Sequence, residues 1–308
     1  MNLDELFGGA VTPSLDCGGK RLLLDRPRIM GILNVTPDSF SDGGDFDNAD
    51  SAIAHALRMV EQGADLIDVG GESTRPGATP VSLQQELDRV IPIVEQLAAR
   101  ADVPISIDTS KAEVMRAAVA AGAGLINDVR ALQSEGAMQT AAILNVPICL
   151  MHMQGKPQIM QAAPHYEDVL SEVKRFLAER VFAAQMVGID KSRLLIDPGF
   201  GFGKSYEHNL VLLARLRELC DLEHLLLVGV SRKRMIGTMT GHDHAKDRMI
   251  GSITAAVIAA QGGAAILRVH DVAETRDALA VLAALTPFRK AKRPAGKGVF
   301  GSARWEEE

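Results

Sequence analysis

The sequence has few cysteines, no long apolar run and no excess of positive charge, and each of these features excludes a class of protein. Its three cysteines, Cys17, Cys149 and Cys220, are far apart and form no C-x-x-C pair, which indicates neither a zinc site nor a disulfide framework. No apolar run reaches the roughly eighteen residues of a membrane-spanning helix, and the N-terminus lacks the pattern of a secretion signal. We therefore expect a cytoplasmic protein that is neither secreted nor inserted in a membrane. The net charge of −6 argues against a nucleic-acid partner, because binding phosphates requires a basic surface.

Short apolar segments alternate with longer segments of helical periodicity along most of the chain. The short segments are rich in Ile, Val and Leu and are expected to form eight strands, at residues 28–35, 66–71, 105–108, 125–129, 147–152, 194–199, 226–231 and 266–270. Between them, apolar residues recur three and four positions apart, as in amphipathic helices. Eight strand–helix units over about 250 residues predict an α/β protein built as a single (β/α)8 TIM barrel. A doubly wound open sheet is the alternative.

Two segments flank the predicted barrel strands and helices. The segment SLDCGGKRLLLDRP predicts a short N-terminal β-hairpin that turns at Gly18 and Gly19. The end of the chain is polar and rich in glycine, proline and lysine. We predict an N-terminal extension over residues 1–15, a barrel domain over 16–286 and a polar C-terminal tail over 287–308.

Polar side chains gather at the carboxyl ends of the predicted strands. Strands buried on both faces of a parallel sheet are normally apolar, so polar groups at these positions are unusual. They are Asn34, Asp68, Asp108, Asn127, Asp128, His152, Asp197, Ser231, Arg232, Lys233, Arg268 and His270. A barrel brings its carboxyl ends to one mouth, where enzymes of this fold have their active sites. Some of the set, above all Asp68 and Asp128, are candidates for merely positioning other groups or capping a helix.

The strand-end residues suggest sites for two kinds of ligand group. Arg268 and His270 lie two apart and face the same side of one strand, and Lys233 ends the neighbouring strand, so together they predict an anion site. Asp108, Asn127 and Asp197 supply acceptors and an amide that suit a flat heterocycle with adjacent N–H and NH₂ donors, such as a guanine or a pterin. His270 has no second histidine at ligand spacing, which argues against zinc.

Two loops after the first two strands have the composition of active-site lids. NVTPDSFSDGGDF and GESTRPGATPVS are rich in Gly, Ser, Thr, Asp and Pro and are longer than a tight turn requires. Asn34 in the first loop offers an oxygen ligand for Mg²⁺, while Thr74 and Arg75 in the second offer donors for phosphate. An ordinary surface loop would have the same composition.

The segment IDPGFGFGKS, residues 196–205, looks at first like a nucleotide-binding phosphate loop. Gly203, Lys204 and Ser205 fit that motif, but Pro198 occupies its first glycine position. Proline has no N–H to donate, and a phosphate loop works by surrounding phosphate with backbone N–H groups. A P-loop hydrolase is therefore the weakest of the alternatives.

Seven motifs, taken in order, resemble one enzyme family. GILNVTPDSFSDGG, DVGGESTRPGA, ISIDTSKAEV, INDV, DPGFGFGK, GVSRK and RVHDV are similar to the motifs of dihydropteroate synthase over about residues 28–285. The resemblance implies a transferase that joins p-aminobenzoate to 6-hydroxymethyl-7,8-dihydropterin diphosphate, releasing pyrophosphate and forming dihydropteroate for folate synthesis. It also implies Mg²⁺, a homodimer, and sulfonamides as inhibitors.

The resemblance assigns roles to the residues that match its motifs. The pterin pocket would contain Asp108, Asn127, Asp197 and Lys233, with Phe202 in its wall. The diphosphate would bind Arg268 and His270, with Asn34 near Mg²⁺ and with Thr74 and Arg75 in the second loop. Phe200 and Ser231 would lie toward the aminobenzoate. Lys233, Arg268, His270 and Asp108 would be the catalytic residues.

The reaction implied is a dissociative C–O cleavage that needs no protein nucleophile. Cationic groups and Mg²⁺ would stabilise the departing diphosphate while the pterin stabilises a methylene cation. A pterin-dependent methyltransferase and a non-catalytic pterin-binding paralogue are the alternatives. The predicted anion site and the two intact loops favour the synthase.

We predict that Lys233→Ala and Arg268→Ala each abolish most turnover, because each removes a charge from the predicted anion and pterin sites. Steady-state rates at saturating substrates test this. A near-normal rate in either variant would refute the site assignment.

Overall fold

The computed structural model describes residues 13–35, 45–73, 80–155 and 164–289. Eight parallel strands close into a barrel, in the order β10-β3-β4-β5-β6-β7-β8-β9. The strands are β3 Arg28–Asn34, β4 Leu66–Gly70, β5 Ile105–Asp108, β6 Leu125–Asp128, β7 Ile148–Met151, β8 Leu194–Asp197, β9 Leu225–Val228 and β10 Ile266–Val269. Because β10 pairs with both β9 and β3, the TIM barrel is confirmed and an open sheet is excluded.

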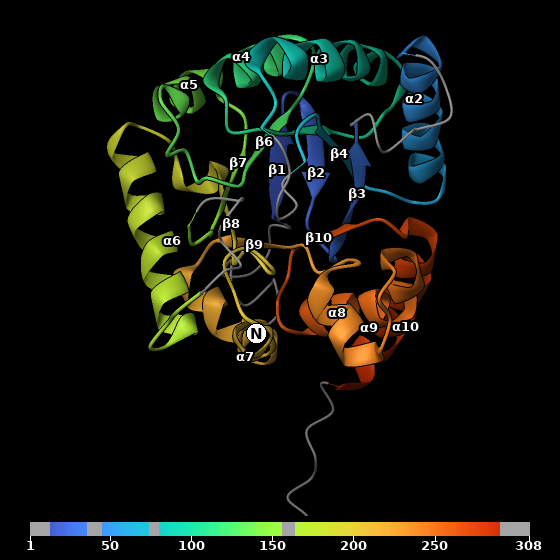
Figure 1. Ribbon diagram of the computed structural model, residues 1–308, viewed down its shortest axis with the longest axis vertical. Coiled ribbons are helices and arrows are strands. Elements are labelled where there is room, and N and C mark those ends of the chain that lie inside the picture. Colours follow the sequence, from blue (N-terminus) through green and yellow to red (C-terminus); the bar gives the residue numbers. More distant parts are fainter. Residues whose placement is uncertain (1–12, 36–44, 74–79, 156–163, 290–308) are drawn as a thin grey trace, which may run out of the picture.

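Helices surround the barrel on its outside (Figure 1). They are α2 Asp45–Glu61, α3 Leu83–Arg100, α4 Ala112–Ala120, α5 Ala137–Leu144, α6 Val169–Met186, α7 Tyr206–Ala214, α8 Arg234–Thr240, α9 Met249–Gln261 and α10 Val272–Arg289. The amphipathic pattern expected from the sequence is clear in α3, where a Ser82 capping box starts the helix and Val90, Ile93, Val94 and Leu97 are buried. No helix among the described residues is long and apolar enough to span a bilayer.

The interior of the barrel is layered by the two-residue period of its strands. Its lower layer is apolar and is formed by Met30, Leu66, Leu125, Cys149, Leu195, Leu227 and Ile266. Residues two positions further along several strands belong to the polar set at the mouth, among them Asp68, Asn127 and Arg268. The barrel is therefore filled with apolar side chains at one end and polar side chains at the other.

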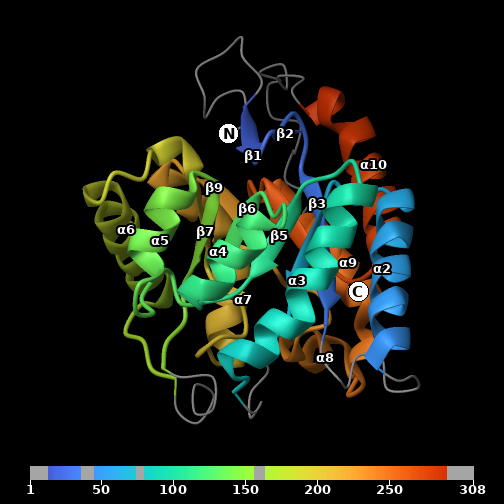
Figure 2. The same cartoon turned by 90° about the horizontal axis from the view of Figure 1, so that it is seen from above.

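A hairpin closes the apolar end of the barrel (Figure 2). It consists of β1 Ser14–Cys17 and β2 Lys20–Leu23, and it turns at Gly18 and Gly19 as predicted, with φ of 64° and 89°. Leu15, Cys17 and Leu22 are buried and belong to the same cluster as the lower barrel layer. The domain boundaries at residues 15 and 286 remain predictions.

Gly124, which precedes β6, is where the hairpin packs most tightly on the barrel. A Cβ added there would lie 2.1 Å from the Cys17 carbonyl oxygen. This contact is with the backbone, which cannot move aside by a rotamer change as a side chain can. We predict that Gly124→Ala lowers the free energy of unfolding by about 2 kcal/mol or more.

Urea denaturation measures this effect, and Gly19→Ala is the matched control in the same hairpin. An added Cβ at Gly19 meets nothing within 4 Å, so only its positive φ opposes the change, at about 1 kcal/mol. Equal losses in the two variants would contradict tight packing at Gly124.

Candidate active site at the carboxyl ends of the strands

The guanidinium of Arg268 joins two carboxylates inside the mouth of the barrel. Its Nε lies 2.6 Å from Asp68 Oδ2, and its second terminal nitrogen lies 2.8 Å from Asp108 Oδ2. Asn127 Nδ2 also donates to Asp68 Oδ2, over 3.1 Å. Burial opposes the charge on Arg268, but the two carboxylates raise its pKa above the ordinary value. Asp68, which is fully buried, thus connects Arg268 to Asn127, and Arg268 in turn binds Asp108.

Asp108 has an environment that favours its protonated form. Burial raises its pKa to about 7, Arg268 opposes the shift, and the charges of Asp68, Asp128 and Glu86 add to it. A carboxyl group with this pKa can donate or accept a hydrogen bond near neutral pH. That versatility suits a ligand whose protonation changes during a reaction.

The amine of Lys233 contacts a carbonyl group and an aromatic ring of the loop that follows β8. It donates to the Phe200 carbonyl and lies 4.6 Å from the centre of the Phe202 ring. Burial lowers its pKa to about 8, and Asp197 opposes the shift. Lys233 therefore remains mostly charged at neutral pH while being only weakly hydrated.

Asp197 ends β8 and begins the same loop. Its Oδ1 accepts from the Gly199 N–H over 2.7 Å. Burial raises its pKa, and Lys233 is the main opposing influence. The structure thus brings Asp197, Lys233 and Phe202 together, and their assignment to a pterin pocket remains a prediction.

Ser231 and His270 are in direct contact, although the motifs assign them to different ends of the substrates. The Ser231 Oγ lies 2.9 Å from His270 Nδ1 and accepts from the His270 backbone N–H over 3.2 Å. The Ser231 hydroxyl can either donate to Nδ1 or accept from it, according to the tautomer of the ring, and it accepts from the His270 backbone in both cases. Ser231 therefore orients His270.

Several predicted residues lie elsewhere or outside the described part of the chain. The Phe200 side chain is fully buried in the hydrophobic core and its carbonyl accepts from Lys233, while its place toward the aminobenzoate remains a prediction. Asn34 ends β3 and is half-buried beside Gly70. Thr74 and Arg75 lie outside the described residues. Asp128 accepts from the backbone of the turn after β6, the structural role considered for it.

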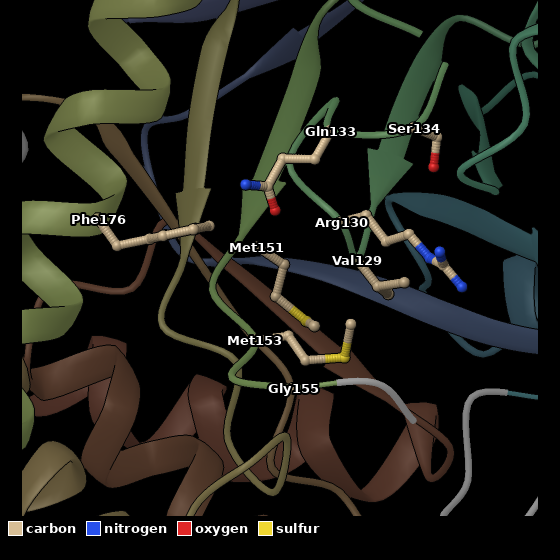
Figure 3. A pocket seen from close by; sticks show the side chains of 8 residues that line it. All are labelled: Val129, Arg130, Gln133, Ser134, Met151, Met153, Gly155 and Phe176. Carbon is tan, nitrogen blue, oxygen red and sulfur yellow. The ribbon is translucent and has the colours of Figure 1, made fainter. Parts of the chain in front are cut away.

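A cavity of about 170 Å³ opens between the ends of β6 and β7. Met151 and Met153 extend into it toward Val129 and Arg130 (Figure 3). These apolar residues were not predicted as a site, because methionines at a strand end are usually packing residues. The available signal was that Met151 and Met153 flank His152 at the end of β7.

Comparison with known proteins agrees with this geometry. The family described as "Pterin binding enzyme" matches residues 30–270. The chain belongs to this family. The dihydropteroate synthase of Escherichia coli K12 is 52% identical over 275 residues, which cover 89% of this chain and 97% of the relative. This degree of similarity to a dihydropteroate synthase confirms the enzyme activity that the motifs predicted.

Solved structures of the family share both the fold and much of the sequence. A Xanthomonas albilineans dihydropteroate synthase in complex with 7,8-dihydropteroate has a TM-score of 0.83 and 57% identity, covering 89% of this chain and 99% of that one. A Yersinia pestis dihydropteroate synthase with a sulfonamide drug has a TM-score of 0.85 and 54% identity, with the same coverage.

We predict that Asp68→Asn lowers kcat/KM by roughly 100-fold, because Arg268 and Asn127 would no longer be held by a carboxylate. Asp65→Asn is the matched control. Asp65 is also a largely buried aspartate that binds two arginines, Arg26 and Arg28, but it lies at the opposite end of the barrel. The control should lose stability and keep its KM values, and equal kinetic losses in both variants would contradict a specific role for Asp68.

The same variant should change the titration of Asp108. Asp68 raises the Asp108 pKa, so removing its charge should move that pKa down from about 7. A raised carboxyl pKa lowers stability as the pH rises from the ordinary value through 7, and Asp68→Asn should reduce this loss. Carbon NMR of the carboxyl groups measures the titration, and an unchanged midpoint would show that Asp68 does not act on Asp108.

Proposed function

We propose that the chain condenses 6-hydroxymethyl-7,8-dihydropterin diphosphate with p-aminobenzoate, forming dihydropteroate and pyrophosphate. The observation that carries the proposal is the meeting of Asp108, Asn127 and Asp197 with Lys233 and Arg268 at one mouth. At this mouth, side chains that can accept hydrogen bonds from a heterocycle lie next to the cations Lys233 and Arg268, which can bind a diphosphate. A related Xanthomonas albilineans enzyme has been solved with 4-aminobenzoic acid, which supports the second substrate.

The heterocycle would bind through groups that are already oriented before it arrives. Asp197 is held by the Gly199 N–H and Asn127 by Asp68, so neither has to reorganise to meet the pterin edge. Lys233 and Phe202 would bound one side of the ring. Preorganised acceptors of this kind favour a guanidine-like edge over other flat molecules.

The proposed reaction is a C–O cleavage that is favoured by the positive charges at the barrel mouth. The bond between the methylene carbon and the diphosphate oxygen breaks, and both electrons leave with the oxygen. Arg268, Lys233 and His270 stabilise the diphosphate, while electrons from the pterin ring stabilise the methylene cation. The amine nitrogen of p-aminobenzoate then forms the new C–N bond and loses a proton to solvent.

The cysteine of the described barrel interior is not suited to act as a nucleophile. Cys149 on β7 is fully buried, and burial raises the pKa of its thiol well above the ordinary value. A protonated thiol is a poor nucleophile. This chemistry supports direct capture of the methylene carbon by the amine.

Asn34 is the residue that we propose to bind Mg²⁺ together with the diphosphate. Its amide oxygen is a hard ligand on a half-buried strand end, and Mg²⁺ is commonly held by one or two protein oxygens plus substrate phosphates. No cluster of three acidic, histidine or cysteine ligands occurs among the described residues, which suits an ion bound largely by substrate. When bound, Mg²⁺ would neutralise negative charge on the diphosphate.

A homodimer would bury the apolar surface of two adjacent helices. Ile250 and Ile258 on α9 and Val281 and Leu285 on α10 are exposed, and Ile250 is 75% exposed. A large exposed apolar patch on neighbouring helices favours a protein interface. We also retain a cytoplasmic location as a proposal, because three unpaired cysteines fit a reducing compartment.

We predict equal amounts of pyrophosphate and dihydropteroate when the protein is given both substrates and Mg²⁺. Chromatography follows the product, and a coupled assay follows pyrophosphate. Asn34→Ala should raise the Mg²⁺ concentration needed for half-maximal rate by roughly 10-fold. A folded protein that binds pterin without releasing pyrophosphate would instead be a non-catalytic binding protein.

A further inference from the structure

Lys204 is a buried cation that the proposed reaction does not use. It lies in the loop after β8 and is only 2% exposed. Its Nζ lies 2.8 Å from His152 Nδ1, 2.9 Å from the Gly199 carbonyl oxygen and 3.0 Å from the Phe202 carbonyl oxygen. Its hydrogen-bonding capacity is thus filled by the protein. A phosphate cannot reach it, so the motif GFGKS does not form a nucleotide site.

The imidazole of His152 completes this arrangement by accepting a hydrogen bond. Burial lowers the His152 pKa to about 2 and Lys204 adds to this shift, so the ring is neutral and can offer the Nδ1 lone pair. The ring is fixed by an edge-on contact with Phe176, with ring centres 4.9 Å apart. Burial also lowers the Lys204 pKa, and Asp197 opposes that shift. The three nearer acceptors match the three N–H groups of an ammonium, and the His152 carbonyl oxygen lies further away, at 3.4 Å.

The loop from Gly199 to Ser205 depends on side chains for its shape. Lys204 binds two of its carbonyls, Lys233 binds that of Phe200, and the Tyr166 hydroxyl donates to that of Gly203 over 2.7 Å. Buried carbonyls need such partners when no strand or helix supplies them. Removing one donor therefore frees a part of the loop.

Close contact with the end of β7 fixes where the loop lies. Gly199 and Gly203 have positive φ, and a Cβ added at either would lie 1.9 Å from the His152 oxygen or 2.3 Å from the Gln154 oxygen. The Lys204 to His152 contact joins the same two segments. The loop and residues 152–154 are thus held together by backbone packing and by one buried hydrogen bond.

Three groups of the candidate site are attached to this loop. Gly199 donates to Asp197, Phe200 accepts from Lys233, and Phe202 supplies the ring beside Lys233. We propose that Lys204, bound by His152, is a positioning residue that fixes this loop so that Asp197, Lys233 and Phe202 together meet the pterin. The inference rests on the proposed function for the identity of the ligand.

Three substitutions at two positions separate positioning from simple support of the fold. Lys204→Met keeps the length of the side chain and removes its donors. His152→Leu removes the acceptor, whereas His152→Asn places an amide oxygen near the position of Nδ1. Lys191→Met is the control, since Lys191 is half-exposed and pairs with the exposed Glu223 at the start of β8.

The measurements are the Kd for 6-hydroxymethyl-7,8-dihydropterin diphosphate by calorimetry and the KM for each substrate, all well below the unfolding temperature of each variant. We expect Lys204→Met and His152→Leu to weaken pterin binding about 10-fold or more and to leave the KM for p-aminobenzoate within about twofold. His152→Asn should recover most of the affinity. The double variant should lose less than the product of the single losses, because both act through one contact.

Normal pterin affinity in folded Lys204→Met or His152→Leu, with only a lower unfolding temperature, would overturn the proposal. If Lys204→Met does not fold, the comparison of His152→Leu with His152→Asn decides, and equal affinities in that pair would also overturn it. Wild-type protein and Lys191→Met are measured alongside. Wild-type protein that binds pterin but does not turn over would contradict the proposed function and leave this binding test valid.

Discussion

The ion pairs of Arg268 with Asp68 and Asp108 are the interaction on which the rest of the site depends. A buried guanidinium is stable only when its charge is matched and its N–H groups are bonded, and here two carboxylates from neighbouring strands do this. Removing either carboxylate would leave an N–H group of the buried guanidinium without its acceptor. The same contacts orient Asn127 and adjust the pKa of Asp108, which burial raises. One network therefore fixes the geometry of the barrel mouth and influences its protonation.

The charges in this mouth suit a reaction that separates charge. Asp108 and Asp197 place carboxyl groups at the barrel mouth, and Arg268 and Lys233 place positive charge there. In a partly buried site such fixed charges act with little screening and need no reorganisation during a reaction. The arrangement supports the proposed reaction, which separates charge and needs no nucleophilic side chain.

Much of the fold could be predicted from the sequence, because buried parallel strands and amphipathic helices have distinct periods. The mouth could be predicted as well, since polar residues that end buried apolar strands gather at the functional face of a barrel. Asp68 was recognised only as a candidate for positioning, because its partner Arg268 is 200 residues away and no local pattern joins them. The resemblance placed Phe202 in the pterin wall and Phe200 toward the aminobenzoate, but no local sequence pattern showed that the Phe200 ring is fully buried. The proposed role of Lys204 could not be predicted from the sequence either, because most of its acceptors are backbone oxygens, which no side-chain motif reveals.

The most direct test of charge stabilisation as the basis of catalysis is isotope exchange in the dihydropterin diphosphate. Heavy oxygen is placed in the bridge between the methylene carbon and the diphosphate, and the substrate is incubated with the protein and Mg²⁺ without p-aminobenzoate. A dissociative C–O cleavage predicts that label appears in non-bridging positions of recovered substrate, or that pyrophosphate is slowly released. If neither occurs in a preparation that forms dihydropteroate once the amine is added, the amine must take part in breaking the bond, and the account is contradicted.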